Sequence, residues 1–424
     1  MANTFRLKLP CRLDRLRTVP TPLRLPLKRF AAIAVWALLL GGAGCRRSSF
    51  PDVPEGYREF AYVSNGGSNT VSVLDLVYLR QDRTLQVGTN PTNLAANPVR
   101  NEIYVVNTQS GTVSVIDADA NRVAATVPVH HLPLFVAVEP TGHRAYVANS
   151  GSNTVSVLDL DRRREIAVAG TGEVPTVARV SPDGRSLVVT NRNSGSASIF
   201  DITPYDAAAS SSPAPKLRAA FSGCPGASDA VILPDSSKVF VACTGGHQVM
   251  AVGLAAAPGS WAAKQNSALM TDHLLTFLDV GKTPVHLAMK PDGGEIFVSN
   301  SDSDSISEIS TWTNEVGGTY VIGSKPVRGI VSGDNGTLWV ANSGADSIAI
   351  YSIDDGRLVG NVRTGSAPDR LAFSEDEHLL LAADAHSGDV AVIRTAGQGP
   401  ALFTILPAGI SPNSIAVKAI QKKP

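Results

Sequence analysis

The chain has 424 residues and equal numbers of basic and acidic side chains, 37 of each. This length allows two or three ordinary domains, or one closed array of repeats. Eight of the basic residues but only one acidic residue lie within residues 1–44, which leaves a net charge of about −7 on the rest. Because nucleic-acid phosphates attract Lys and Arg, this excess of acidic residues argues against a nucleic-acid partner.

Residues 1–44 predict a signal peptide of the lipoprotein type. A basic stretch precedes the apolar run Phe30–Leu40, which is too short for a permanent membrane helix and fits a secretory signal. Small residues before Cys45 resemble the bacterial lipobox, which predicts a lipid on Cys45; ordinary cleavage nearby is the alternative. We therefore expect an exported protein of the bacterial cell envelope, facing the periplasm or the outside. Residues 45–58 would be a tether, and the lipid its only contact with the membrane.

The cysteine count predicts one disulfide. Cys11 would leave with the signal peptide, and Cys45 would carry the lipid. Cys224 and Cys243 then remain as a pair in an oxidising compartment, where disulfides persist.

One motif recurs along the remainder of the chain. In its clearest copies, Asn65–Asp75, Asn107–Asp117 and Asn149–Asp159, a strand ends in Asn and a Val-Ser-Val run ends ten residues later in Asp. A strand that opens sixteen residues before the next Asn position precedes seven of the copies, beginning at Pro91, Pro133, Pro175, Ala227, Pro284, Pro326 and Pro368. A unit of about 42 residues with four short strands is typical of a β-propeller blade.

The two ends of the repeat array predict how the ring closes. The strand that opens at Pro412 has no Asn-ended partner after it, and the first Asn-ended strand has no Pro-led strand before it. Pairing these two strands completes a blade and removes the free sheet edges. We therefore predict an all-β propeller over residues 59–420 with eight blades. Seven blades would require that one unit, the fifth, stays outside the ring.

The motif resembles a known family. Tyr-Val-x-Asn followed by Ser-Asn-Thr-Val-Ser-Val-Leu-Asp is similar to the YVTN family of β-propeller repeats, and the resemblance covers residues 60–418. The family includes lactonase-like and surface-layer-type propellers, commonly with seven blades. The resemblance implies a binding or interaction scaffold without naming a partner. For lactonase-type members it also implies inner-ring Arg, His and acidic residues that open a sugar lactone.

Candidate site residues come from comparing the units at one position of the Pro-led strand, which should be innermost. Two residues after the Pro position, four consecutive units carry Asp229, His286, Arg328 and Arg370, and Asp369 precedes the last of them. Guanidinium groups bind carboxylates and phosphates bidentately, so the cluster predicts a site for a small anionic ligand. The alternative is that the two aspartates pair with the arginines and bridge neighbouring blades.

Other features are weaker. His130, His131, His247 and His386 lie in loops on the expected ligand face, but their spacing is not typical of a metal site. The run Asn300–Asp304 carries oxygen donors for Ca²⁺, or is simply an Asx-rich turn. Two insertions, around Ser210–Pro215 and at Ala255–His273 with Trp261, are surface insertions or a docking surface. No catalytic motif, metal or cofactor is predicted.

Three functions remain open. The sequence favours a monomeric, non-enzymatic binding scaffold whose partner is a protein or a small anionic ligand. The first alternative is a lactonase-type hydrolase of a sugar lactone. The second is a periplasmic binder of a haem-like or quinone redox cofactor, with His130, His131 or His286 as its ligand.

Overall fold

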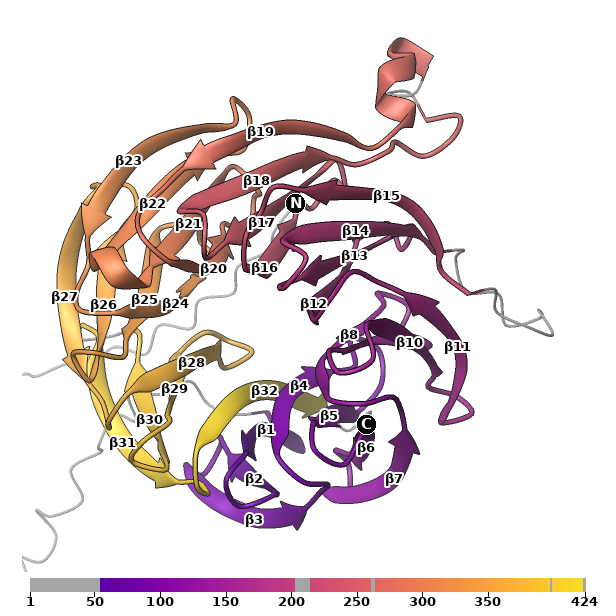
Figure 1. Cartoon of the computed structure of the whole chain (residues 1–424). Helices are drawn as coiled ribbons and strands as arrows, with labels where there is room; N and C mark the ends of the chain where they lie inside the picture. The colour runs from indigo at the N-terminus through magenta and orange to yellow at the C-terminus, as the bar shows by residue number, and fades with distance from the viewer. Residues whose placement is uncertain (1–53, 203–213, 261–263, 397–398, 422–424) are drawn as a thin grey trace, which may run out of the picture. The chain divides into compact units, whose positions relative to one another are not determined.

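The structure, a computed structural model, describes residues 54–202, 214–260, 264–396 and 399–421. Within them, 32 strands form eight four-stranded antiparallel sheets. The first strand of each sheet contacts the first strands of its two neighbours, so the sheets close into a ring (Figure 1). The prediction of an all-β propeller with eight blades is confirmed. The signal peptide, Cys45, Trp261 and most of the first insertion lie outside the described residues.

The first blade closes the ring as predicted, because the last strand of the chain pairs with the first. Blade 1 consists of β32 (Pro412–Gln421), β1 (Tyr57–Asn65), β2 (Thr70–Asp75) and β3 (Arg80–Gln86). Blade 2 consists of β4 (Pro91–Ala96), β5 (Glu102–Asn107), β6 (Thr112–Asp117) and β7 (Arg122–Pro128). Blade 3 consists of β8 (Pro133–Val138), β9 (Arg144–Asn149), β10 (Thr154–Asp159) and β11 (Arg164–Gly170). Blade 4 consists of β12 (Pro175–Val180), β13 (Ser186–Asn191), β14 (Ser196–Asp201) and β15 (Lys216–Ser222).

The other four blades follow the same order from the channel outwards. Blade 5 consists of β16 (Ala227–Ile232), β17 (Lys238–Cys243), β18 (Gln248–Gly253) and β19 (His273–Asp279). Blade 6 consists of β20 (Pro284–Met289), β21 (Glu295–Asn300), β22 (Ser305–Ser310) and β23 (Glu315–Val321). Blade 7 consists of β24 (Pro326–Val331), β25 (Thr337–Asn342), β26 (Ser347–Ser352) and β27 (Arg357–Arg363). Blade 8 consists of β28 (Pro368–Phe373), β29 (Leu379–Asp384), β30 (Asp389–Arg394) and β31 (Ala401–Pro407).

The repeated Asn is a clamp between the second and third strands of a blade. In blade 1, Asn65 Nδ2 donates to Thr70 Oγ1 at 3.1 Å and to Ser72 Oγ at 3.0 Å. The corresponding pairs of hydrogen bonds recur in blades 2, 3, 4 and 6. Since the Asn side chains are fully buried, losing these bonds would leave a buried donor unpaired. The most conspicuous letters of the repeat are therefore architectural.

Packing between blades forms the core. The second and third strands of each blade are almost entirely buried, and their apolar side chains form clusters with those of the next blade. Tyr62, Tyr104 and Tyr146 are among the largest fully buried side chains. Burying a large apolar side chain contributes about 1.5–3 kcal/mol, so this inter-blade packing is the main source of stability.

Two blades replace the Asn clamp by other chemistry. In blade 5, Cys243 takes the Asn position and forms a disulfide with Cys224, the pair that the sequence predicted. In blade 8 the position is occupied by Asp384, and the residue five positions later is Asp389 instead of Ser or Thr. Burial, and then the hydrogen bond to Asp389, raises the pKa of Asp384 to about 7. Asp384 is therefore partly protonated at neutral pH.

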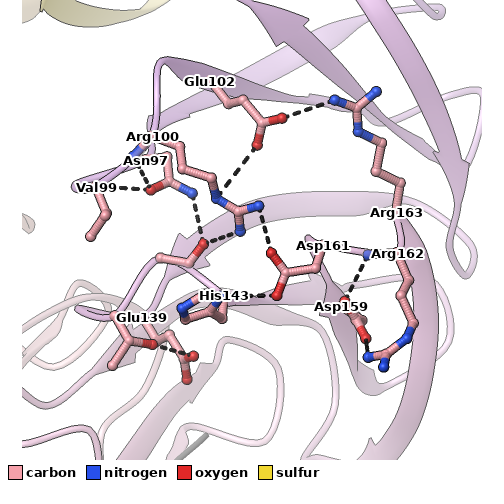
Figure 2. A network of polar contacts seen from close by, with 12 residues as sticks. Asn97, Val99, Arg100, Glu102, Glu139, His143, Asp159, Asp161, Arg162 and Arg163 are labelled. Carbon is pink, nitrogen blue, oxygen red and sulfur yellow. Dashed lines mark hydrogen bonds and ion pairs between the residues drawn. The ribbon is translucent and has the colours of Figure 1, made fainter. Parts of the chain in front are cut away.

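A network of ion pairs joins blades 2 and 3 at the face opposite the Asn loops (Figure 2). Arg100, after β4, donates to Asp161, after β10, at 2.7 Å, and Arg163 donates to Glu102 at 3.0 Å. His143 Nδ1 lies 2.9 Å from the same Asp161. Arg100 and Arg163 thus each meet a carboxylate of the other blade.

The second insertion forms a small groove on that same face. Residues between β18 and β19 include the 3-10 helix η1 (Ser267–Met270), and the Arg218 guanidinium binds Asp272 at 2.6 Å. Leu254, Leu269 and Leu275 contribute to a cavity of about 380 Å³ there. No helix in the described part of the chain is long and apolar enough to cross a bilayer.

Candidate ligand site in the central channel

A cavity of about 620 Å³ lies in the channel at the ends of the inner strands where the Asn loops meet. The inner strands begin at this face, because each opening Pro lies opposite the Asn that ends the second strand. The cavity is lined by side chains that come within the first few positions of the inner strands. They include Asn93, Leu134, Phe135, Val177, Arg179, Asp229, Arg328, Asp369, Arg370 and Ser414.

The position two residues after each opening Pro has an architectural function in half of the blades. There the side chain accepts a hydrogen bond from a backbone N–H of the next inner strand. The four acceptors and their donors are Ser414 and Leu94 at 3.1 Å, Asn93 and Val136 at 3.0 Å, Asp229 and Leu287 at 3.1 Å, and His286 and Gly329 at 3.2 Å. Phe135, Val177, Arg328 and Arg370 occupy the other four positions and have no acceptor atom to offer.

Asp229 is fully engaged by the protein. Its Oδ1 lies 3.1 Å from the Arg179 guanidinium of blade 4, and its Oδ2 accepts from Leu287 N–H of blade 6. Burial raises the pKa of Asp229, but the electrostatic effect of the neighbouring His286, Arg179 and Arg328 outweighs it and holds the pKa below its ordinary value. Asp229 is therefore ionised and joins three blades, through Arg179 and Leu287 N–H and not through Arg328 or Arg370 as the bridging alternative expected.

His286 is buried behind the cavity wall and does not line the cavity. Its Nδ1 accepts from Gly329 N–H, so the proton of the neutral ring lies on Nε2, which faces Asp229 Oδ2 at 3.6 Å. Burial, and then the charge of Arg328, lowers the pKa of His286 well below its usual range. The ring is neutral at pH 7, and both of its nitrogens face protein groups.

Arg328 is the exception among these residues. Its Nε is buried and has no hydrogen-bond partner among the described residues, and its guanidinium forms no ion pair with them. Burial, and then the positive charge of Arg370, lowers the pKa of Arg328 to about 9. The side chain is still protonated at neutral pH. It therefore presents a positive charge to the cavity without a protein counter-ion in contact with it.

Arg370 lies beside it, on the next blade. Its guanidinium is 3.2 Å from the Asp369 carboxylate, and both side chains are about one-third exposed. Because the two residues are neighbours in β28, this pair does not bridge blades. Four of the five predicted site residues, Asp229, Arg328, Asp369 and Arg370, line one cavity, and His286 lies behind them.

The sequence comparison missed Arg179 and gave no function to Phe135. The Arg179 guanidinium lies over the Phe135 ring, 4.8 Å from its centroid, and its Nε donates to Ala230 O at 2.9 Å. Arg179 is four residues after the opening Pro, where the other inner strands carry small or apolar residues. A comparison at that second position would have found it.

Two of the remaining candidates, His247 and the Asn300–Asp304 turn, make hydrogen bonds within the loops. His247 has a left-handed backbone (φ 55°), and its Nδ1 accepts from Thr283 N–H at 3.3 Å. In the Asn300–Asp304 turn, Asp302 accepts from Thr283 Oγ1 at 2.7 Å and Asp304 accepts from Lys325 N–H at 2.8 Å. No group of three or more metal-ligating side chains occurs among the residues that the structure describes.

Comparisons with known proteins agree with this architecture. Residues 329–404, which hold Arg370 but not Arg328, match the family described as "Lactonase, 7-bladed beta-propeller". This match covers less than a fifth of the chain, and the structure has eight blades. No curated protein matches the sequence.

Three solved structures illustrate the likeness in fold. A putative 6-phosphogluconolactonase from Bacteroides uniformis has a TM-score of 0.58 at 16% identity, over 86% of this chain and 100% of that one. Its counterpart from Bacteroides fragilis has a TM-score of 0.57 at 15% identity, over 87% and 100%. Dihydro-heme d1 dehydrogenase NirN, in complex with DHE, has a TM-score of 0.67 at 14% identity, over 88% and 77%. At such identities the likeness shows the fold alone, a β-propeller, here with a positively charged cavity in its channel.

Proposed function

We propose that this protein is a non-enzymatic binding propeller that holds a small anionic ligand in its central channel through Arg328 and Arg370. The observation that carries the proposal is the unpartnered Nε of Arg328 in a wall where other polar side chains are hydrogen-bonded. A buried charge without a partner is costly. An anion in the cavity would supply the missing counter-ion and up to two hydrogen bonds in fork geometry.

The neighbouring positions support this interpretation. Asn93 and Ser414 occupy the same position in blades 2 and 1 and bond to the next inner strand. An arginine cannot accept that bond, so Arg328 gives up an inter-blade contact. The loss is understandable if the guanidinium serves a ligand instead. The predicted lipid on Cys45 would place this binding site in the cell envelope.

The experiment is calorimetric titration of the purified protein with inorganic phosphate, gluconate and 3-phenylpropionate. We expect at least one of these anions to bind, and its affinity to fall about tenfold or more in Arg328→Asn, since a charge-assisted hydrogen bond contributes about 1.5–3 kcal/mol. Arg363→Asn is the matched control, because Arg363 is exposed on the outer strand of the same blade. If no anion binds, or if both variants bind like the native protein, the proposal is wrong.

A second candidate is hydrolysis of a sugar lactone. The match of residues 329–404 to a lactonase family and the descriptions of the two Bacteroides structures favour it. Asp369 would be the carboxylate to test, because Asp229 already binds Arg179 and Leu287 N–H. Consumption of gluconolactone above the rate in buffer, lost in both Arg328→Asn and Asp369→Asn, would establish this activity. A rate equal to buffer would exclude it for this substrate.

A haem-like ligand is a third candidate, because the NirN structure contains DHE. The structure argues against His286 as its axial ligand, since both ring nitrogens face protein groups. His130 Nε2 lies 3.5 Å from Glu165, which leaves His131 as the remaining histidine to test. A visible absorption band after addition of haemin, lost in His131→Ala, would support this function. An unchanged haemin spectrum would contradict it.

A further inference from the structure

The two sides of the channel cavity differ in chemistry. The inner strands follow one another around the ring in the order of the blades, so in a ring of eight each blade faces the one four places away. Blade 3 therefore lies across the channel from blade 7, as Figure 1 shows for β8 and β24. At the same position of these two strands stand Phe135 and Arg328. In the same way Val177 of blade 4 lies across from Arg370 of blade 8.

The side across from Arg328 and Arg370 offers hydrocarbon next to the paired Arg179. Leu134 and Phe135 line the cavity and are half-buried. The hydroxyls on either side of them are already bonded within the protein: Thr92 Oγ1 to Thr108 Oγ1 at 2.7 Å, and Thr176 Oγ1 to Thr190 Oγ1 at 2.9 Å. Blades 2 and 3 contribute no ionisable side chain to the described cavity wall. This side suits an apolar group better than a polyhydroxylated one.

The charges of the wall sum to a single positive charge. Arg179 is balanced by Asp229 at 3.1 Å, and Arg370 by Asp369 at 3.2 Å. His286 is neutral at pH 7, because its pKa lies well below the usual range. Arg328 is the one ionisable residue of the described wall that is left without a counter-ion. A ligand with one negative charge would complete the balance.

We infer that the ligand is a monocarboxylate with an apolar, aryl-bearing body. Its carboxylate binds Arg328 with the help of Arg370, and its body packs against Phe135 and Leu134 across the channel. The inference rests on the proposed function and narrows it. A cavity of about 620 Å³ has room for such a molecule. A sugar acid would have to bury its hydroxyls against hydrocarbon on that side.

The test compares three probes on the folded protein by calorimetry: 3-phenylpropionate, its uncharged amide, and gluconate. We expect 3-phenylpropionate to bind about tenfold or more tightly than gluconate, because only it buries a ring on the apolar side. We expect the amide to bind about tenfold or more weakly than the acid, because it lacks the charge that Arg328 requires.

Three variants test which residues cause these preferences. Phe135→Asn should reduce the preference for 3-phenylpropionate over gluconate to about threefold or less, whereas Phe135→Leu should retain most of it. Asn is a residue that this position accepts in blade 2, where Asn93 bonds Val136 N–H, so the variant is expected to fold. Arg328→Asn should weaken both anions alike.

The outcomes separate the two proposals. If gluconate or phosphate binds through Arg328 and 3-phenylpropionate binds no better, the anion site stands and the apolar ligand is wrong. If the preference survives in Phe135→Asn, the body lies elsewhere and the inference is again wrong. If no anion binds at all, the proposed function itself fails.

Discussion

The junction of blades 2 and 3 and the channel wall of blades 7 and 8 differ in whether their arginines are paired with carboxylates. At the junction, Arg100 and Arg163 each meet a carboxylate of the other blade within 3.0 Å, although the site is partly exposed (Figure 2). In the channel wall, Arg328 is partly buried, its Nε is fully buried, and it has no counter-ion in contact. Pairing is needed most where water is absent. The junction charges are paired although water reaches them, so the unpaired arginine in the channel wall indicates a function other than holding blades together.

The largest effect on stability is expected where a pair is buried in the same region. Glu139 and Arg144 lie 2.9 Å apart and their side chains are only 3% exposed. Glu139→Ala should lower the free energy of unfolding by about 3–5 kcal/mol, because the Arg144 charge loses this carboxylate. Urea denaturation measures the change. An effect below 1 kcal/mol would show that burial does not make pairing necessary in this fold.

The next largest effect on stability is expected at Asp384, whose carboxyl group lies near that of Asp389. Burial and Asp389 raise the pKa of Asp384 to about 7, so the folded state holds a proton that the unfolded state releases near pH 4. The native protein therefore loses stability as the pH rises from about 4 to 7. Asp384→Asn lacks this titration and restores the residue found in other blades. It should match the native protein at pH 4 and be more stable by about 4 kcal/mol at pH 8, which is three pKa units at about 1.4 kcal/mol each.

The control for this prediction is Asp355→Asn, since Asp355 is exposed. Its stability relative to the native protein should change little between pH 4 and pH 8. If Asp384→Asn behaves like this control, Asp384 does not hold a proton in the folded state near neutral pH.

A smaller effect of the opposite sign is expected at Arg328. Replacing it by Asn removes an unpartnered charge and supplies an acceptor for the next inner strand, as Asn93 does in blade 2. In the absence of ligand, Arg328→Asn should therefore raise the free energy of unfolding by about 1–2 kcal/mol. Thermal unfolding in an anion-poor buffer measures it. A clear loss of stability would mean that the arginine serves the fold.

The smallest effect is expected at the partly exposed junction. Arg100→Asn removes the ion pair with Asp161, but the Asp161 carboxylate stays accessible to water. The change should therefore lower the free energy of unfolding by at most about 1 kcal/mol. The cost should shrink further in 0.5 M salt, because salt screens exposed pairs. A loss above about 2 kcal/mol would place this network among the main supports of the ring.

Much of the fold follows from spacing alone. The distance of sixteen residues between Pro and Asn positions is the length of two short strands and their turn, and the unpaired ends at Asn65 and Pro412 predicted the closure. The Asn clamp gives these positions a physical reason. The two cysteines could be paired because the strand that opens at Ala227 lies against the one that ends at Cys243.

The candidate site could be predicted only in part. Comparing one position of the inner strands gave Asp229, Arg328 and Arg370, which share the cavity. The comparison could not say that His286 would lie behind the wall, because the side-chain direction depends on how each inner strand twists against its neighbour. Arg179 was missed because it reaches Asp229 from another blade and another position.

A crystal structure with 4-bromophenylacetate would show directly whether Arg328 binds the carboxylate of a ligand in the channel, because the bromine is located by anomalous scattering. We expect the carboxylate within hydrogen-bond distance of the Arg328 guanidinium and the bromine on the Phe135 side of the channel. A channel without the compound while it is bound elsewhere, or an orientation with the carboxylate away from Arg328, would contradict it.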